Sequence, residues 1–462
     1  MINILRKKEE REFFMKKILA IILTICLMAS VFCVTAVSSV AADDTSRSST
    51  DVILVRGLKK GMEMNDKDAL VTLGSFKSYE EGWSKAAKYA KDDNFMKDYD
   101  RIVVDLLADW NSVGGYFADE PLFEDDPGFK WDTIYIGANV RMMINMNGHT
   151  IDRKLTDDIA NGEVIYIDED ADVIINGGQY GDPIVKLGEN PGDVKMGTIT
   201  GGYSWNGAGG IHINNKANVV LNNVILKGNS VNRDDGMAIA VYDHAILTMN
   251  GGKIVDNKGD HAVFGAVYVN DADATLNDVL ISGNKITTNY VGRGSVCAGG
   301  AGCVDGGTLT FNNCTITNNH CDRIGGAIGV LAGNAYLNEC IVTENSAGID
   351  GSAIAISGVG TCTATNCDLT GNVNTKWDSV FYAGTGTINI IDSKYDNKLR
   401  ETGGKIIVSS TAEAPTEPAS IFSEGSVAMI VACVALLTSA ACIFVVFYNK
   451  KKLEPKAENT EE

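Results

Sequence analysis

The chain has 462 residues, 49 of them glycine, and a formal net charge of −19. Such an acidic excess excludes a general nucleic-acid-binding protein, because an acidic surface repels a phosphate backbone. It also argues against polyuronate substrates unless a cation bridges the two negative partners. The length allows more than one ordinary domain.

Residues 1–42 have the pattern of a secretory signal peptide. The basic segment Met15-Lys16-Lys17 is followed by an apolar run from Ile18 to Cys33, and small residues end at Ala41-Ala42. A charged start, an apolar centre and a small-residue cleavage site are the three parts of such a peptide. The sequence therefore predicts export, with an uncleaved N-terminal anchor as the alternative.

Residues 43–137 are predicted to form an N-terminal α/β cap. The segment 79–92 (YEEGWSKAAKYAKD) is amphipathic, with Trp83 and three alanines on one side, and this predicts a helix. The segments 101–108 and 133–136 are rich in β-branched residues and predict strands. A repeat array needs a cap to cover its end, which is the role we expect here.

Residues 138–408 contain a repeat of about 27 residues. The copies share an apolar residue, a run of polar and apolar residues, and a final asparagine; they include LNNVILKGN (221–229), MNGGKIVDN (249–257), LNDVLISGN (276–284), FNNCTITNN (311–319), LNECIVTEN (337–345) and ATNCDLTGN (364–372). A second short strand follows each copy, with apolar residues at alternate positions, as in Ile239 and Val241. One such unit cannot bury its apolar side alone, so neighbouring units must stack.

This pattern predicts an all-β chain folded as a right-handed parallel β-helix, the hand being that of most parallel crossovers. The final asparagines are expected to form a turn ladder, because asparagine tolerates left-handed backbone and stacked amides pair along the stack. Cys314, Cys340 and Cys367 share one column with Val224 and Val279, which predicts a ladder of buried thiols. Disulfides between coils and metal binding are the alternatives.

The segments ITNNHCDRIGGAIGV (316–330) and VTENSAGIDGSAIAI (342–356) resemble the FxxN and GGA[IL] repeats of polymorphic outer-membrane proteins and related adhesin-like β-helices. The resemblance covers roughly residues 205–400 and implies a pectin-lyase-like β-helix with a role in adhesion. The predicted helix at 79–92 is similar to the one that plugs many pectate-lyase-like β-helices. The chain departs from the outer-membrane family in having a single apolar segment where that family has a C-terminal barrel.

A Pro/Thr/Glu-rich spacer at 409–424 is followed by a predicted transmembrane helix at 425–448. The run from Val427 to Tyr448 has no charged residue, and three lysines follow it. The tail 449–462 should then be cytoplasmic and the preceding part extracellular. This arrangement predicts a single-pass protein of the cell membrane, displayed by a Gram-positive bacterium.

Two long loops, 181–208 and 285–299, interrupt the repeat, and long insertions in repeat proteins often lie on the binding face. Short loops between them carry further polar residues, and aromatic rings in the insertions can stack on sugars. We therefore expect a saccharide groove between the two long loops, lined by Tyr203, Trp205, Arg233, Asp234, Asp235, His261, Tyr290 and Arg293.

A catalytic alternative rests on residues 232–239 (NRDDGMAI), which faintly resemble the DDCIAI segment of polygalacturonase-type hydrolases. Glycoside hydrolysis needs one carboxylic acid and one carboxylate. Asp235 or Asp260 would then be the acid and Asp234 the base, with His261 one coil further on. The other motifs of that family are missing.

No metal site or cofactor is predicted. Asp168, Asp170 and Asp172 alternate along the chain, but the glycine and glutamate of a calcium-binding EF-hand loop are missing, so calcium lacks a supporting motif. The sequence thus favours a surface adhesin or saccharide-binding protein. Its expected partners are an extracellular polysaccharide or a cell-surface glycoconjugate, and the plasma membrane through residues 425–448. A polysaccharide hydrolase or lyase is the second interpretation, and a structural surface stalk is the third.

Overall fold

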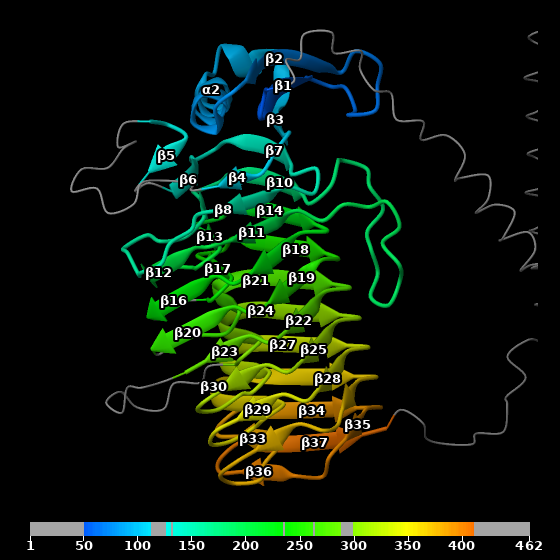
Figure 1. The fold of residues 1–462 in the computed structure, drawn as a ribbon. Coiled ribbons are helices and arrows are strands. Elements are labelled where there is room, and N and C mark those ends of the chain that lie inside the picture. The colour runs from blue at the N-terminus through cyan, green and yellow to red at the C-terminus, as the bar shows by residue number, and fades with distance from the viewer. Residues whose placement is uncertain are drawn as a thin grey trace, which may run out of the picture.

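The chain is wound into a stack of coils, which Figure 1 shows running from the N-terminal helix to the last strands. The computed structural model describes residues 50–111, 126–130, 133–233, 236–261, 264–287 and 299–410. The predicted signal peptide and transmembrane segment lie outside these residues. Among the helices that are described, none is long and apolar enough to cross a bilayer.

Three sheets run along the stack, and they are called sheets A, B and C here. Sheet A contains β1 (Ile53–Lys59), β2 (Leu70–Phe76), β3 (Tyr99–Leu106), β5 (Phe129–Lys130), β6 (Thr133–Ile136), β7 (Arg141–Asn145), β9 (Ile165–Ile167), β10 (Asp172–Asn176), β13 (Ile211–Ile213), β14 (Asn218–Asn222), β17 (Ile239–Tyr242), β18 (Ile246–Asn250), β21 (Val267–Asn277), β24 (Gly302–Asn312), β27 (Ile328–Asn338), β30 (Ile354–Thr365), β33 (Phe381–Ala383), β34 (Thr387–Ile391), β36 (Leu399–Glu401) and β37 (Lys405–Ser409).

Sheets B and C are built from shorter strands. Sheet B contains β4 (Trp110–Asn111), β8 (Thr150–Asp152), β11 (Thr198–Thr200), β15 (Ile225–Lys227), β19 (Lys253–Val255), β22 (Leu280–Ser282), β25 (Thr315–Thr317), β28 (Ile341–Thr343), β31 (Asp368–Leu369) and β35 (Lys394–Tyr395). Sheet C contains β12 (Tyr203–Asn206), β16 (Ser230–Arg233), β20 (Lys258–His261), β23 (Lys285–Ile286), β26 (His320–Cys321), β29 (Ser346–Ala347) and β32 (Val373–Asn374).

Each coil passes through sheet A, then B, then C, and the next coil pairs with it in parallel register. Ile211 of β13 is opposite Ile239 of β17, and Leu226 of β15 is opposite Ile254 of β19. The stacked parallel strands that the repeat predicts are therefore present. The hand of the coil stays a prediction.

The core is a set of columns of like apolar side chains inside the stack. The column that precedes each final asparagine by eight residues is fully buried, as the sequence predicted; its members are Leu221, Met249, Leu276, Phe311, Leu337 and Ala364. Burying a Leu, Phe or Met side chain stabilises a fold by about 1.5–3 kcal/mol, so repeating the column stabilises every coil alike.

The final asparagines form the predicted ladder at the turn between sheets B and C, and we call it the B–C asparagine ladder. All six are buried, and the amide nitrogen of each of the first five donates to the amide oxygen of the next; the members are Asn229, Asn257, Asn284, Asn319, Asn345 and Asn372. Each backbone N–H from Asn229 to Asn345 donates to that same oxygen.

The predicted left-handed backbone of these asparagines is wrong. None of them has a positive φ, which belongs to the residue just before each, such as Gly228 (63°) and Asp256 (56°). The asparagine keeps an ordinary backbone because its function in the turn is carried by its side chain.

A second asparagine ladder follows sheet A, at its turn toward sheet B. Each amide donates to the preceding coil, through Asn338, Asn312, Asn277, Asn250, Asn222, Asn176 and Asn145. The last amide donates to the Asp105 carboxylate at 2.9 Å. Arg56 binds both oxygens of that carboxylate at 2.7 Å, so the ladder ends on an acceptor held by an ion pair.

The cysteine column is a ladder of free, buried thiols, as predicted. Cys314, Cys340 and Cys367 are almost completely buried, and no described cysteine is in a disulfide. Cys340 lies between the other two, and hydrogen bonding within this thiol column together with burial raises its pKa to about 12. The Cys340 thiol therefore stays protonated and unreactive at physiological pH.

The described part of the N-terminal region contains the helix α2 (Tyr79–Lys91), almost where the sequence predicted it. Ser78 caps it by accepting from the Glu81 N–H, and Trp83 is buried with its indole N–H bound to the Gly128 carbonyl at 2.7 Å. A short 3₁₀ helix, η1 (Phe95–Lys97), follows. Strands β1, β2 and β3 pair antiparallel, and β3 joins β7 in parallel, so this region lies at the N-terminal end of the stack (Figure 1).

Candidate functional site

The segments predicted as loops after the final asparagines are strands of sheet C. Ser230, Lys258 and Lys285 each follow such an asparagine and open β16, β20 and β23. The outer side of sheet C is therefore a continuous face in which side chains of successive coils lie in register.

The two long loops that were expected to flank a groove belong to different turns of the coil. The extra residues of 181–208 lie between β10 of sheet A and β11 of sheet B, whereas 288–298 connect β23 of sheet C to β24 of sheet A. The insertions leave the stack at different turns. The sequence pattern misleads because Asn176, before the first insertion, belongs to the second asparagine ladder and not to the B–C ladder.

Five of the predicted site residues nevertheless come together on three adjacent strands of sheet C. Tyr203 and Trp205 lie on β12, Arg233 on β16, and Asp260 and His261 on β20. Register pairing joins β12 to β16 and β16 to β20, and Figure 1 shows the three strands side by side. The remaining predicted residues, Asp234, Asp235, Tyr290 and Arg293, lie outside the described residues.

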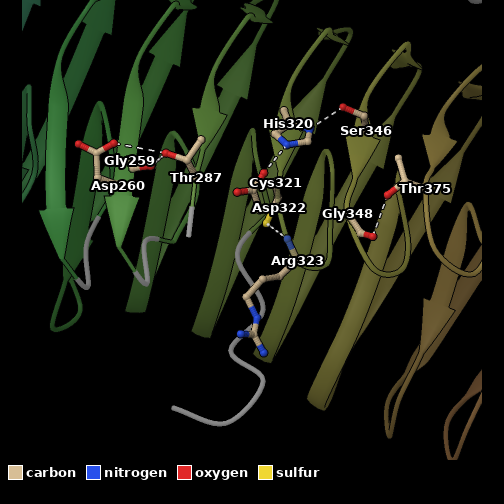
Figure 2. A network of polar contacts seen from close by, with 10 residues as sticks. All are labelled: Gly259, Asp260, Thr287, His320, Cys321, Asp322, Arg323, Ser346, Gly348 and Thr375. Atoms are coloured by element: carbon tan, nitrogen blue, oxygen red, sulfur yellow. Dashed lines mark hydrogen bonds and ion pairs between the residues drawn. The ribbon is translucent and has the colours of Figure 1, made fainter. Parts of the chain in front are cut away.

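Asp260 is the polar centre of this group. Its Oδ2 accepts from the Tyr203 hydroxyl at 3.2 Å, and its Oδ1 accepts from the Thr287 hydroxyl at 3.3 Å (Figure 2 shows the second contact). Burial and the nearby Asp260 carboxylate raise the pKa of Tyr203 to about 12, so its hydroxyl remains a donor. Asp260 thus ties three coils of the face together and serves as a hydrogen-bond acceptor.

Trp205 supplies the large aromatic surface of the group. Its side chain is 45% exposed, and the guanidinium of Arg233 lies 5.3 Å from the ring centroid. A half-exposed indole next to a cation and several hydroxyl and carboxylate groups is the combination that sugar rings require, an apolar face beside polar edges.

His261 is held by a chain of polar contacts. Its Nδ1 lies 2.7 Å from the Asn232 amide oxygen, and the amide nitrogen of Asn232 donates to the Asp158 carboxylate at 2.6 Å. An amide oxygen only accepts, so His261 donates from Nδ1 to Asn232. We call Tyr203, Trp205, Asn232, Arg233, Asp260 and His261 the sheet C patch.

The same face continues into a cluster that the sequence analysis missed. His320 Nδ1 lies 2.8 Å from the Ser346 hydroxyl, and its Nε2 lies 2.7 Å from the Asp322 carboxylate (Figure 2). The signal available in the sequence is the spacing of His320 and Asp322, because residues two apart on a strand share a face. The partner Ser346 cannot be found without the register between coils.

Sheet A carries aromatic residues on its outer side that were also missed. The rings of Tyr166 and His212 stack at 4.8 Å, and those of His212 and Tyr242 at 5.0 Å. Burial lowers the pKa of His212 to about 4, so the imidazole is neutral. Because these rings cover one another's faces, we interpret them as a stabilising column between coils and not as a sugar platform.

Glu163, just before β9, is a buried acid. Its carboxylate oxygens have no hydrogen-bond partner, and burial raises its pKa to about 7, although Arg153 acts in the opposite direction. It takes a position that Gly209 and Met237 occupy in the next two coils, as the register of β9, β13 and β17 shows. Its environment therefore favours the protonated, neutral form.

The alternating aspartates have separate partners. Asp168 accepts from the Tyr135 hydroxyl, and Asp172 pairs with Arg101 at 3.1 Å. In the part of the chain that the structure describes, no group of three or more His, Cys, Asp or Glu side chains could hold a metal ion.

No family model, curated protein or solved structure matches the chain. The function is therefore argued from the geometry of sheet C.

Proposed function

We propose that this is a cell-surface saccharide-binding β-helix, and that the sheet C patch binds the ligand. The observation that carries the proposal is the half-exposed indole of Trp205 beside the hydrogen-bonded Tyr203 and Asp260. Binding needs an aromatic surface and a few fixed polar partners, and the patch has both. A long stack of coils with outward-facing polar side chains also fits the adhesin role that the repeat implies.

The proposed ligand is an extracellular polysaccharide or a cell-surface glycoconjugate without a high negative charge. The net charge of −19 disfavours polyanions, while Arg233, Asp260 and His261 offer both donors and acceptors for hydroxyl groups. The proposal includes the right-handed pectin-lyase-like coil, the N-terminal cap, the signal peptide at 1–42 and the anchor at 425–448. Buried Trp83 supports the cap, because α2 packs into the same core as the first coils.

A matched pair of tryptophans tests the site. Trp377 is 51% exposed, and the guanidinium of Arg400 lies 4.7 Å from its ring, so it resembles Trp205 in exposure and in its cation neighbour. It follows β32 and lies far along the stack from β12. On a glycan array probed with the full-length protein, we expect Trp205→Ala to weaken binding at least tenfold and Trp377→Ala to leave it unchanged. Equal losses in both variants would contradict the proposed site.

The hydrolase alternative is tested in the same experiment by measuring reducing ends released from any bound glycan. We expect binding without release, and we expect Trp205→Ala to weaken binding more than Asp234→Asn does. Release that disappears in Asp234→Asn or Asp235→Asn would replace the binding proposal by polysaccharide hydrolysis.

Surface proteolysis tests the anchor and the topology. Protease added to intact cells should remove the part that precedes the spacer and leave residues 449–462 protected. Recovery of the mature protein in the medium without detergent would argue against the membrane anchor.

A further inference from the structure

The cluster of Ser346, His320 and Asp322 on sheet C has the connectivity of an activated serine. The imidazole bridges a hydroxyl at 2.8 Å and a carboxylate at 2.7 Å (Figure 2). All three side chains are partly buried, at a level between the core and the exposed surface. They therefore remain accessible to a small substrate.

The fold fixes this arrangement through strand register. His320 of β26 is the direct partner of Ser346 of β29, so their side chains lie beside each other on one face. Asp322 follows β26, two residues after His320, and therefore shares that face. The buried Cys321 between them accepts from the Arg323 N–H at 3.3 Å, which fixes the backbone where β26 ends.

The contacts decide which ring nitrogen carries the proton. An ionised carboxylate can only accept, so Nε2 of His320 carries the hydrogen that Asp322 receives. In the neutral imidazole Nδ1 then has a lone pair, and it accepts a hydrogen bond from the Ser346 hydroxyl. This is the protonation pattern of a serine nucleophile with its base and an orienting acid, with the two ring nitrogens interchanged relative to chymotrypsin-like enzymes.

Ser346 is partly exposed, and the residue two positions further on is a glycine. A Cβ at Gly348 would meet the Asp322 carbonyl oxygen at 2.1 Å, so the backbone of the two coils is closely packed there and the position requires glycine. Ser230 occupies the same outward column in β16, but its register partners are Tyr203 and Lys258, so it has no histidine beside it.

We propose that Ser346, His320 and Asp322 form an acyl-transfer site that hydrolyses short acyl esters. Ser346 Oγ attacks the ester carbonyl carbon while His320 Nδ1 takes its proton; the alcohol then leaves with that proton, which forms an acyl-serine. A water molecule, deprotonated by His320 Nδ1, attacks this acyl group; the bond from the acyl carbon to Ser346 Oγ breaks, the carboxylic acid leaves, and His320 returns the proton to Ser346 Oγ. Asp322 is the positioning residue that holds the tautomer.

The natural ester would be a short acyl group on a saccharide, and this part rests on the proposed function. Asp260 of the sheet C patch is on β20 and His320 is on β26, two strands further along the same sheet. Strands in a sheet are about 4.8 Å apart, so the two sites are separated by ~10 Å. A saccharide bound at Trp205 and extending along sheet C would reach Ser346 with its neighbouring sugar units.

The test uses the full-length protein, p-nitrophenyl acetate as substrate and a fluorophosphonate probe with mass-spectrometric location of the adduct. We expect labelling at Ser346, and at least a 100-fold loss of kcat/KM in Ser346→Ala and in His320→Ala. Ser230→Ala is the matched control and should keep full activity. Asp322→Asn should lower kcat and change the pH profile, and Asp322→Glu should restore part of the rate.

Absence of wild-type labelling, labelling that persists in Ser346→Ala, or an equal loss in Ser230→Ala would each overturn the inference. The melting temperature of every variant is measured, because a folded Ser346→Ala without activity supports the site directly. Trp205→Ala should lose glycan binding but still hydrolyse p-nitrophenyl acetate. If glycan binding is absent while esterolysis persists, the saccharide part fails and the acyl-transfer site stands.

Discussion

The B–C asparagine ladder and the outer face of sheet C occur on the same coils, but the ladder repeats one residue from coil to coil and the outer face does not. In the ladder, six coils repeat one residue and one set of hydrogen bonds. On the outer face, different coils present Trp205, Asp260 or His320, each with different partners. Repetition thus maintains the stack, whereas departure from repetition produces individual sites. If the repeated interior maintains the fold and the varied outer face forms the sites, substitutions in the interior should cost more stability than substitutions on the outer face.

A charge placed in the interior should disrupt the stack. Cys340→Asp would bury a carboxylate between Cys314 and Cys367, and we expect a loss of about 3–5 kcal/mol or failure to fold, because an unpaired buried charge is strongly destabilising. Val stands at this position of the column in other coils, as Val224 and Val279 do, so Cys340→Val should cost less than about 1.5 kcal/mol. Urea unfolding measures both changes.

The thiols provide a second readout of the same column. In the native protein they should resist alkylation and should react only after unfolding, since burial keeps the reagent away from all three sulfur atoms. Fast labelling of Cys340 under native conditions would show that the column does not face inward.

Removing one member of the ladder should cost less than a buried charge but more than any change on the outer face. In Asn284→Ala the backbone and amide N–H groups of Asn257 lose their acceptor, and Ile254 and Asn319 lose a donor. Buried groups left without partners cost about 1–3 kcal/mol each, so we expect a total of about 2–4 kcal/mol after relaxation. Ser230→Ala, on the outer face of a nearby coil, should change stability by less than about 0.5 kcal/mol. A ladder variant as stable as this control would refute this expectation.

A smaller, pH-dependent effect comes from Glu163, which breaks the repetition inside the stack. Its pKa is about 7 in the folded protein and 4.5 in an unperturbed chain, so the folded state binds the proton more tightly. Its contribution is complete below pH 4.5 and is lost as the pH rises through 7. Integrated over that window the loss is on the order of 3 kcal/mol, and relaxation around the charge reduces it.

Glu163→Gln should remove this loss. Urea midpoints of wild type and variant should lie close together at pH 5 and separate at pH 8, with the variant more stable. His212 contributes in the opposite direction, since its lowered pKa makes stability fall as the pH drops from 6.5 toward 4. A separation of the two midpoints that grows toward acid pH would contradict the assignment to Glu163.

The sequence predicted what repetition encodes. The alternation of Ile239 and Val241, the column of final asparagines and the inward cysteines follow from a regular period, and the structure confirms them. The helix at Tyr79–Lys91 was predictable because its amphipathic pattern and its cap are local. The two asparagine columns looked alike in sequence, but they lie at different turns and their amides donate in opposite directions along the stack, so the first long loop was assigned to the wrong turn.

The candidate sites were less predictable for a related reason. Tyr203 and Asp260 are 57 residues apart, and the contact between them depends on register and on side-chain reach across a whole coil. Ser346 and His320 meet because a turn and two sheets return the chain to the same point after 26 residues. Glu163 has no signature of its own, since its burial follows from its place in the stack, in register with Gly209 of the next coil.

The second asparagine ladder also allows the number of coils, and so the length of the stack, to change. In each coil the amide nitrogen of the asparagine donates to the preceding coil, and its amide oxygen accepts from the following coil. A coil duplicated or deleted within the array would therefore leave every hydrogen bond of this ladder in place. Only Asp105, fixed by Arg56, is unique, and it sets the origin from which the coils are counted. Duplication of one coil would lengthen the stack by about 4.8 Å, so the length of the molecule can change in evolution while the core of each coil stays the same.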